Sequence, residues 1–351
     1  MDNVIITQNL EETLQQALQN NPCDRLFLLT DTTTHELCKP LVEQFPCMNG
    51  AQEIVIGATD THKTLQTLAS VWEQLQKGGA TRHSLLVSLG GGMVTDLGGF
   101  AASTFKRGIR YINIPTTLLA MVDASVGGKT GINFGGLKNE IGVFSEAQKV
   151  IIHTAFLRSL DDENLLSGYA EMLKHGLIST PQHLHALLAF PIEDWREHLE
   201  ELAALIRESV AVKANIVEQD PHEQNLRKAL NLGHTFGHAF ESHALTTPRP
   251  LLHGYAVAYG LVCELFLSCV QCGFPTDTMR PAVQFVREHY GTPRITCDDY
   301  PTLIQLMRHD KKNTGDSINF TLLSGVGQLQ LNQTATTKTI EEALDFLREG
   351  L

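Results

Sequence analysis

The first 115 residues alternate short runs of aliphatic and β-branched residues with amphipathic stretches, and this alternation constrains the fold most strongly. The runs lie at residues 4–6, 26–29, 54–56, 85–89 and 111–114, and stretches such as residues 64–75 carry helical periodicity between them. Strands that alternate with helices indicate βα units, in which successive strands pair in parallel. The pattern therefore predicts an α/β fold whose N-terminal domain is Rossmann-like and binds a nucleotide.

Beyond about residue 160 the strand-like runs stop and helical periodicity takes over. It covers residues 161–178, 195–219, 223–243, 254–272 and 279–289, and residues 318–323 and 328–331 predict a late hairpin around Gly325 and Gly327. We therefore predict an α/β domain over residues 1–158 and an α-helical domain over residues 159–351. Because no long linker separates them, we expect direct packing that leaves a cleft, and clefts between domains bind ligands.

The charge balance limits the partners. A formal net charge of -12 gives no basic field that would attract nucleic acid or an anionic membrane, so we expect neither as a partner. The apolar run at residues 256–274 is interrupted by Glu264 and Gln271 and is predicted to be a buried core helix. The seven cysteines lack disulfide-framework spacing and Met1-Asp2-Asn3 begins no signal peptide, so we expect a cytoplasmic protein.

A glycine turn follows the fourth strand-like run directly, as Gly90-Gly91-Gly92. At the carboxyl end of a parallel strand, such a turn lets backbone N–H groups and a helix N-terminus approach a phosphate. Thr95 stands where the dinucleotide fingerprint G-x-G-x-x-G has its last glycine, so both a nucleotide site and a plain strand-to-helix turn stay open. Asp31, which closes the second run, suits either a ribose hydroxyl or a turn.

Histidines mark a candidate metal site. Residues 231–238 read Asn-Leu-Gly-His-Thr-Phe-Gly-His, so His234 and His238 share one face if the segment is helical. His253 follows later, and Glu171 lies in an earlier helix-like run. Two or three imidazoles and one carboxylate suit a divalent ion that keeps a position open for substrate. The H-x-x-x-H spacing is also common on solvated helices, and both interpretations stand at this point.

Nine motifs together resemble the 3-dehydroquinate synthase family, in the same order, from about residue 25 to 325. They are Gly90-Gly91-Gly92-x-x-x-Asp96, Arg107-Gly108, residues 115–123, Gly127-Gly128-Lys129, Lys138-Asn139, Glu171-x-x-Lys174, Asn231-x-Gly233-His234-x-x-Gly237-His238, His253-Gly254 and Asp310-Lys311-Lys312. The resemblance implies conversion of 3-deoxy-D-arabino-heptulosonate 7-phosphate to 3-dehydroquinate, the second step of the shikimate pathway. It also implies NAD as a catalytic cofactor, a zinc or cobalt ion, and a homodimer.

The resemblance assigns residues to roles. It implies that Glu171, His234 and His253 bind the metal, while His238 faces the substrate. The implied cofactor contacts are Asp31, Asp60, Lys63, Gly91, Gly92, Met93, Asp96, Thr116, Thr117, Lys138, Phe156 and Ser159. The implied substrate contacts are Asp123, Lys129, Asn139, Lys174, Lys213, Arg227, Asn231, His238, one or both of Lys311 and Lys312, and Arg107 reaching in from a partner subunit. Tyr255 and Asp60 depart from the family, which usually has Glu at both positions.

Three other functions are compatible with parts of this pattern. Another sugar phosphate cyclase or a metal-dependent polyol dehydrogenase would share the architecture, but Lys213, Arg227 and Asn231 favour a substrate that carries a carboxylate. A non-catalytic sensor of NAD or metal would need none of the lysines implied to bind phosphate.

Overall fold

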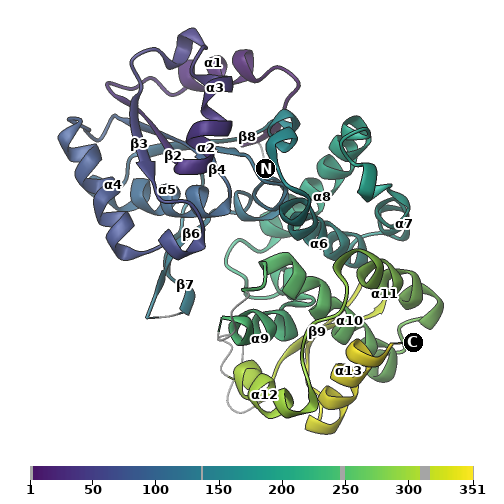
Figure 1. Ribbon diagram of the computed structural model, residues 1–351. Coiled ribbons are helices and arrows are strands. Elements are labelled where there is room, and N and C mark those ends of the chain that lie inside the picture. Colours follow the sequence, from purple (N-terminus) through teal and green to yellow (C-terminus); the bar gives the residue numbers. More distant parts are fainter. Residues whose placement is uncertain (1–2, 136, 246–249, 309–316, 351) are drawn as a thin grey trace. The chain divides into compact units, whose positions relative to one another are not determined.

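The computed structural model describes residues 3–135, 137–245, 250–308 and 317–350. The chain divides into two compact units, residues 1–161 and 162–351 (Figure 1). Parallel strands occur in the first unit and helices dominate the second, which confirms the predicted α/β class with an α-helical second part.

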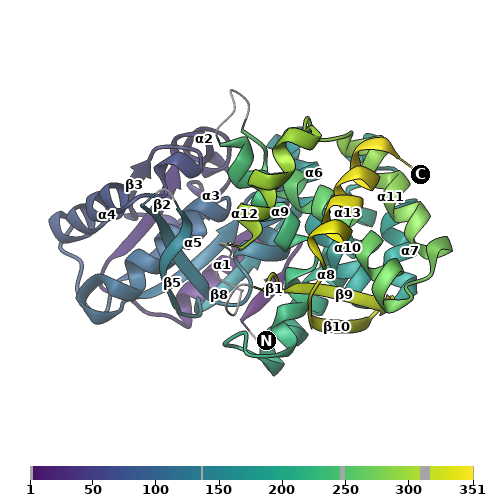
Figure 2. The ribbon, with the colours of Figure 1, turned by 90° about the horizontal axis from the view of Figure 1, so that it is seen from below.

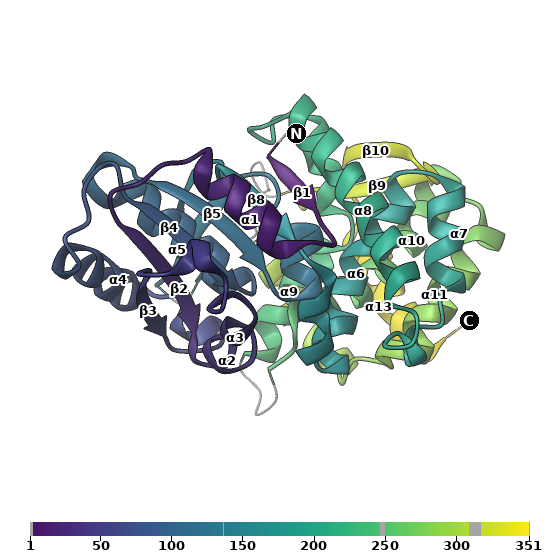
Figure 3. The same cartoon turned by 90° about the horizontal axis from the view of Figure 1, so that it is seen from above.

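A six-stranded parallel sheet with strand order β1-β8-β5-β4-β2-β3 forms the centre of the first unit (Figure 3). Its strands are β1 (Val4–Ile6), β2 (Leu26–Asp31), β3 (Gln52–Ile56), β4 (Leu85–Gly90), β5 (Arg110–Pro115) and β8 (Lys149–Ile152). Its helices are α1 (Leu10–Gln19), α2 (Thr32–Leu37), α3 (Lys39–Val42), α4 (Leu65–Lys77) and α5 (Gly92–Thr104). Short helical turns are η1 (Pro46–Met48), η2 (Asp60–His62), η3 (Phe105–Arg107), η4 (Ala120–Ala124) and η5 (Thr154–Ser159).

The central strands are buried along their whole length because both faces of the sheet are covered. Every residue of β4 is buried, and α5 packs against β2, β4 and β5. Such strands are continuous apolar runs and show no alternation, as residues 85–89 do. The chain passes from β3 to β4 across β2, so the order of the strands reverses between β2 and β4. Ligands of open α/β sheets bind at this kind of reversal, outside the carboxyl ends of the strands.

An antiparallel hairpin of β6 (Lys129–Phe134) and β7 (Leu137–Phe144) begins at Lys129 of the Gly127-Gly128-Lys129 motif and contains the Lys138-Asn139 motif. All eight residues of β7 are exposed, so no buried face imposes an apolar alternation on them. Glycine, asparagine and lysine are also depleted in strands. The hairpin therefore gives no recognisable strand pattern, and it went unpredicted.

The second unit consists mainly of helices packed around α10 (His253–Cys272), which contacts four other helices and β9. The remaining helices are α6 (Asp162–Ile178), α7 (Pro181–Ala189), α8 (Leu199–Gln219), α9 (His234–Ala244), α11 (Thr276–Tyr290), α12 (Tyr300–Arg308) and α13 (Thr337–Glu349), with the turns η6 (Ile192–Asp194), η7 (Leu226–Asn231) and η8 (Cys297–Asp299). The predicted hairpin is confirmed as β9 (Phe320–Gly325) and β10 (Gln328–Gln333) (Figure 2).

Within the described part of the chain, α10 alone is long and apolar enough to cross a membrane. However, 67% of its most apolar stretch is buried inside the protein, which confirms the predicted core helix.

The predicted helical segment 223–243 is interrupted. Only η7 and α9 are helical, because Gly233 between them has a left-handed φ of 81°. A residue at this φ cannot continue a right-handed helix, and glycine adopts it at little cost. The break makes His234 the first residue of α9, with consequences for the candidate metal site.

Candidate active site

Three side chains from separate helices meet in the second unit. Glu171 lies on α6, His234 begins α9 and His253 begins α10. The Oε1 atom of Glu171 is 3.5 Å from Nε2 of His234 and 3.3 Å from Nε2 of His253. A tetrahedral zinc ion with bonds of about 2.1 Å spaces its ligand atoms about 3.4 Å apart. The spacing therefore suits a zinc-sized ion.

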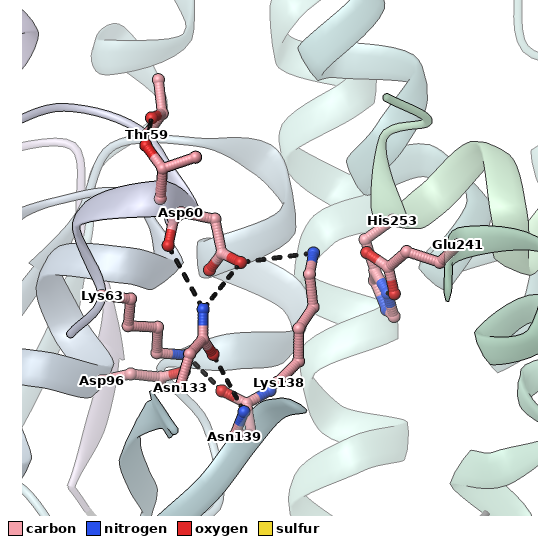
Figure 4. Close-up of polar contacts among 10 residues, drawn as sticks. Thr59, Asp60, Lys63, Asp96, Asn133, Lys138, Asn139, Glu241 and His253 are labelled. Carbon is pink, nitrogen blue, oxygen red and sulfur yellow. Dashed lines mark hydrogen bonds and ion pairs between the residues drawn. The ribbon is translucent and has the colours of Figure 1, made fainter. Parts of the chain in front are cut away.

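In each ring, Nδ1 points away from Glu171 and makes a hydrogen bond that orients the imidazole as a ligand. Nδ1 of His234 lies 3.1 Å from the backbone oxygen of Leu232, and Nδ1 of His253 lies 3.4 Å from Oε2 of Glu241 (Figure 4). Because both partners only accept, each Nδ1 carries the proton and donates it. When the rings are neutral, as they are when they bind a metal ion, each Nε2 then presents a lone pair toward Glu171.

The electrostatics of Glu171 also fit a cation. Its side chain is fully buried, and among the described residues Oε1 has no hydrogen-bond partner, while Oε2 is paired with Lys174. Burial raises the pKa of Glu171, but the Lys174 ammonium and His234 outweigh burial and hold this pKa well below its usual range. An ionised oxygen that faces two imidazole lone pairs requires a positive charge between them.

The pKa of His253 depends on its burial and on two neighbouring carboxylates. Burial lowers its pKa, but the carboxylates of Glu241 and Glu171 prevail and raise it to about 10. The metal-free site therefore attracts a proton where a metal ion would bind. Both observations show that the donor set fits a divalent ion.

Two buried contacts place the ligand-bearing helix ends, and the sequence interpretation missed both. The fully buried carboxylate of Glu264 on α10 accepts from the N–H groups of Gly233 (2.7 Å) and Thr235 (3.1 Å), on either side of His234. The N–H of Gly254 donates to Oγ of Ser167 on α6 at 3.1 Å. A charged residue inside the apolar run 256–274 was the available signal for Glu264, and Ser167 gave none.

The third histidine of the cluster is His238, one turn after His234 on α9. Its ring centroid lies 5.4 Å from that of His234 and 6.3 Å from that of His253. The structure therefore brings His238 close to the ligand set, but the group of three ligand atoms that Glu171, His234 and His253 place within 4.8 Å of one another does not include His238.

Buried cations accompany the cluster in this unit. The side chains of Lys174, Lys213 and Arg227 are all buried, which is rare for charges on an ordinary solvated helix. The loop before η7 is fixed by Asp220, whose carboxylate accepts from three backbone N–H groups, including that of Arg227 at 3.0 Å. Asn231 donates to Oε1 of Glu223 at 2.7 Å.

In the first unit, several predicted cofactor residues gather at the carboxyl ends of β2, β4 and β5. Asp31 ends β2 and caps α2 by accepting from the N–H of Thr34 at 2.7 Å. Gly91 and Gly92 follow β4, and the N–H of Thr116, after β5, donates to the oxygen of Gly90 at 3.0 Å. No side chain in the described residues caps α5, so its N-terminal N–H groups are suited to an anion.

The remaining predicted cofactor residues lie near these strand ends. Met93 is in the first turn of α5, and Thr117 packs against Gly91. Phe156 and Ser159 lie in η5, where Oγ of Ser159 is 4.0 Å from Sγ of Cys38.

A polar network joins four predicted cofactor residues to Asn139 (Figure 4). Nζ of the buried Lys63 contacts Oδ2 of Asp96 at 2.6 Å and Oδ1 of Asn139, and Nζ of Lys138 lies 3.3 Å from Oδ2 of Asp60. Asn133 links the two pairs. Its amide donates to Oδ2 of Asp60 at 3.1 Å, and its Oδ1 accepts from the N–H of Asn139 at 2.9 Å.

The network accounts for the backbone conformation of Asn139 in the hairpin. Asn139 has a left-handed φ of 51°, which asparagine adopts more readily than most residues with a side chain, and the hydrogen bond that its N–H donates to Oδ1 of Asn133 helps to hold it there. Asn133 was not predicted, because only the pairing of β6 with β7 brings it to the network.

Family models for the N-terminal and C-terminal parts of 3-dehydroquinate synthase match residues 53–167 and 168–313. The chain belongs to the 3-dehydroquinate synthase family. A 3-dehydroquinate synthase from Parabacteroides distasonis is 53% identical over 347 residues, which cover 99% of this chain and 98% of that protein.

Two solved structures of other synthases share the fold. ValA, a 2-epi-5-epi-valiolone synthase from Streptomyces hygroscopicus solved with NAD+ and Zn2+, superposes with a TM-score of 0.85 at 25% identity, covering 98% of this chain and 96% of that chain. A 2-deoxy-scyllo-inosose synthase complexed with carbaglucose-6-phosphate, NAD+ and Co2+ gives 0.82 at 22% identity, covering 99% and 96%.

The other substrate residues expected of a 3-dehydroquinate synthase occupy varied positions. Asp123 lies in the π-helical turn η4, and Lys129 begins β6 and lines a small hollow with Asp96. Arg107 is exposed with a φ of 67°. Lys311 and Lys312 lie outside the described residues.

Tyr255, where the family resemblance leads one to expect Glu, packs edge-on against Tyr290 with ring centroids 5.1 Å apart.

Proposed function

We propose that this chain is a 3-dehydroquinate synthase, a lyase of the second step of the shikimate pathway. It converts 3-deoxy-D-arabino-heptulosonate 7-phosphate to 3-dehydroquinate and phosphate through oxidation, β-elimination of phosphate, reduction, ring opening and intramolecular aldol closure. The observation that carries the proposal is the spacing of Glu171, His234 and His253 in a chain whose family is established. The α/β domain of residues 1–158 would hold NAD, and residues 159–351 would hold metal and substrate.

A zinc or cobalt ion bound by Glu171, His234 and His253 would supply Lewis acidity to the substrate hydroxyls. Lys174 neutralises the second oxygen of Glu171, so this carboxylate stays ionised and ready to bind the metal. His238, beside the ligand set, would donate a hydrogen bond to the phosphate that leaves.

Anionic groups of the substrate would be held by separate cations. Lys213, Arg227 and Asn231 would hold the carboxylate, because a guanidinium and an ammonium that are already buried bind an anion strongly. Fixing the carboxylate would also keep the ring-opened substrate in the folded conformation that the aldol closure needs. The implied phosphate contacts are Lys129, Asn139, His238, Lys311 or Lys312, and Arg107 from a second subunit of a homodimer.

NAD would supply a hydride acceptor that later becomes the donor, so the cofactor is not consumed. The pyrophosphate would bind the glycine turn and the N-terminus of α5, where N–H groups point outward. Lys63 and Lys138 are held in place by Asp96 and Asp60, which orders both cations before any anion binds. We also propose a cytoplasmic location and no nucleic acid or membrane partner.

The test is phosphate release by the purified, zinc-loaded protein from 3-deoxy-D-arabino-heptulosonate 7-phosphate with catalytic NAD, while NADH absorbance is followed. We expect many phosphates per NAD without lasting NADH, and none from a Glu171→Ala control. NADH that accumulates in proportion to substrate would instead indicate the polyol dehydrogenase. If the protein binds NAD and metal but releases no phosphate from this substrate, the synthase function is rejected and a different cyclase is favoured.

A further inference from the structure

We propose that Glu241 is a positioning residue that orients His253 for metal binding and tightens the site's hold on the metal. Oε2 of Glu241 lies 3.4 Å from Nδ1 of His253 (Figure 4). The other ring nitrogen, Nε2, faces Glu171. The proposal rests on the metal centre of the proposed function. It assigns a role to a carboxylate that is not itself a ligand.

The helix geometry brings Glu241 to this position. His234, His238 and Glu241 are spaced i, i+4 and i+7 along α9, so all three lie on the face that carries the metal ligand. The H-x-x-x-H pattern is therefore the first part of a longer pattern that ends in a carboxylate. His253 begins α10, the helix that packs most extensively on α9, and its ring meets Glu241 from there.

The two histidine ligands are held in different ways. Nδ1 of His234 bonds to the neutral carbonyl of Leu232, two residues earlier in the chain, so local backbone fixes its ring. His253 stands at a helix start, and the acceptor for its Nδ1 comes from another helix as a carboxylate with only 6% of its side chain exposed. Burying this carboxylate is costly unless it is compensated.

The carboxylate has two consequences for the metal. It fixes the tautomer of His253 with the proton on Nδ1, so that Nε2 is free to bind. It also withdraws the Nδ1 proton partly toward oxygen, which makes the imidazole a stronger donor to a cation. Loss of such a partner typically weakens metal binding about 10- to 100-fold.

The experiment compares Glu241→Gln with Glu241→Met in the full chain. Gln keeps an oxygen that accepts from Nδ1–H but removes the charge, whereas Met has a similar length and removes both. Zinc dissociation constants are measured by competition with a chromophoric chelator, without substrate or NAD, and the visible absorption of the Co2+ form is recorded. The thermal midpoint of each metal-free protein is measured in parallel.

The chain offers a matched control in Glu208. Its carboxylate lies 3.1 Å from Nδ1 of His183, which is ion-pair distance from a histidine outside the proposed ligand set, although half of the Glu208 side chain is exposed. Glu208→Gln should leave zinc affinity and the Co2+ spectrum unchanged.

We expect Glu241→Met to weaken zinc binding about 10- to 100-fold and to shift the Co2+ absorption, with Glu241→Gln affected less than tenfold. Zinc binding of Glu241→Met within twofold of wild type would overturn the proposal. So would equal weakening in both variants that follows an equal drop in metal-free stability, since that indicates a purely structural role. Wild-type zinc binding without phosphate release would reject the synthase function and leave this inference intact, and no zinc binding by the wild type would overturn both.

Discussion

Replacing Gly254 by alanine tests how the protein brings His253 to Glu171. A Cβ at position 254 would lie 1.8 Å from the backbone oxygen of Ser167 and 2.5 Å from its Cα, whereas real Cβ contacts below 3.0 Å essentially never occur. The start of α10 must therefore withdraw from α6 by about 1.2 Å, because no flexible side chain is there to yield. The absence of a side chain at Gly254 is what allows the two helices to approach.

The displacement acts directly on the metal site. His253 precedes Gly254, and its Nε2 atom now lies 3.3 Å from Oε1 of Glu171. Moving His253 by about 1.2 Å would widen that distance well beyond the roughly 3.4 Å that a tetrahedral zinc ion spans. We expect zinc affinity to fall at least about 100-fold, about 2.7 kcal/mol, and the metal-free protein to lose about 1–3 kcal/mol from overpacking.

The assay is zinc competition with a chelator, together with thermal unfolding of the metal-free protein. Ser167→Ala is the matched control, because it removes the hydroxyl that accepts from the N–H of Gly254 without adding an atom. The control should weaken zinc binding much less than Gly254→Ala does, because losing one hydrogen bond adds no clash between α10 and α6. If Gly254→Ala retains wild-type zinc affinity and stability, the close approach of α10 to α6 does not position the ligand, and the reasoning fails.

Three further predictions concern other parts of the molecule. Lys63→Met should weaken NAD binding about tenfold or more, measured by fluorescence titration, because a buried cation between Asp96 and Asn139 is lost; unchanged affinity would exclude Lys63 from the cofactor site. Asp220→Asn should raise the Michaelis constant more than it lowers the turnover number, because one side-chain oxygen cannot accept all three loop N–H groups. Burial raises the pKa of Asp220, but these donors outweigh it and lower the pKa, so the loop's stabilisation is present above about pH 4 and is lost as pH falls; a wild-type pH profile in the variant would contradict this. A chelator should lower the thermal midpoint of the wild type but not of Glu171→Ala, since an ion that binds only the folded state stabilises it.

The sequence predicted the architecture well where burial leaves a periodic pattern. The continuous apolar run at residues 85–89 became a strand buried on both faces, and the apolar run with Glu264 in it became the core helix α10. These patterns are local, because the period of a strand or helix appears in consecutive residues. The hairpin of β6 and β7 was not predicted, because the exposed residues of β7 carry no such period.

The site required information that local patterns do not carry. H-x-x-x-H spacing places His234 and His238 on one face, but it does not say which second helix faces them. Glu241 continues that face and Glu264 caps the start of α9, yet both depend on how α9 packs against α10. The motif order of a family supplied the ligand set that spacing alone left open.

The central claim is that Glu171, His234 and His253 together bind the catalytic metal. Its most direct test is a crystal structure of the zinc-loaded protein with anomalous data collected at the zinc edge. We predict one peak at about 2.0–2.2 Å from Oε1 of Glu171 and from Nε2 of both histidines, with His238 unbound. An ion held between His234 and His238, with Glu171 or His253 outside its coordination sphere, would contradict the account.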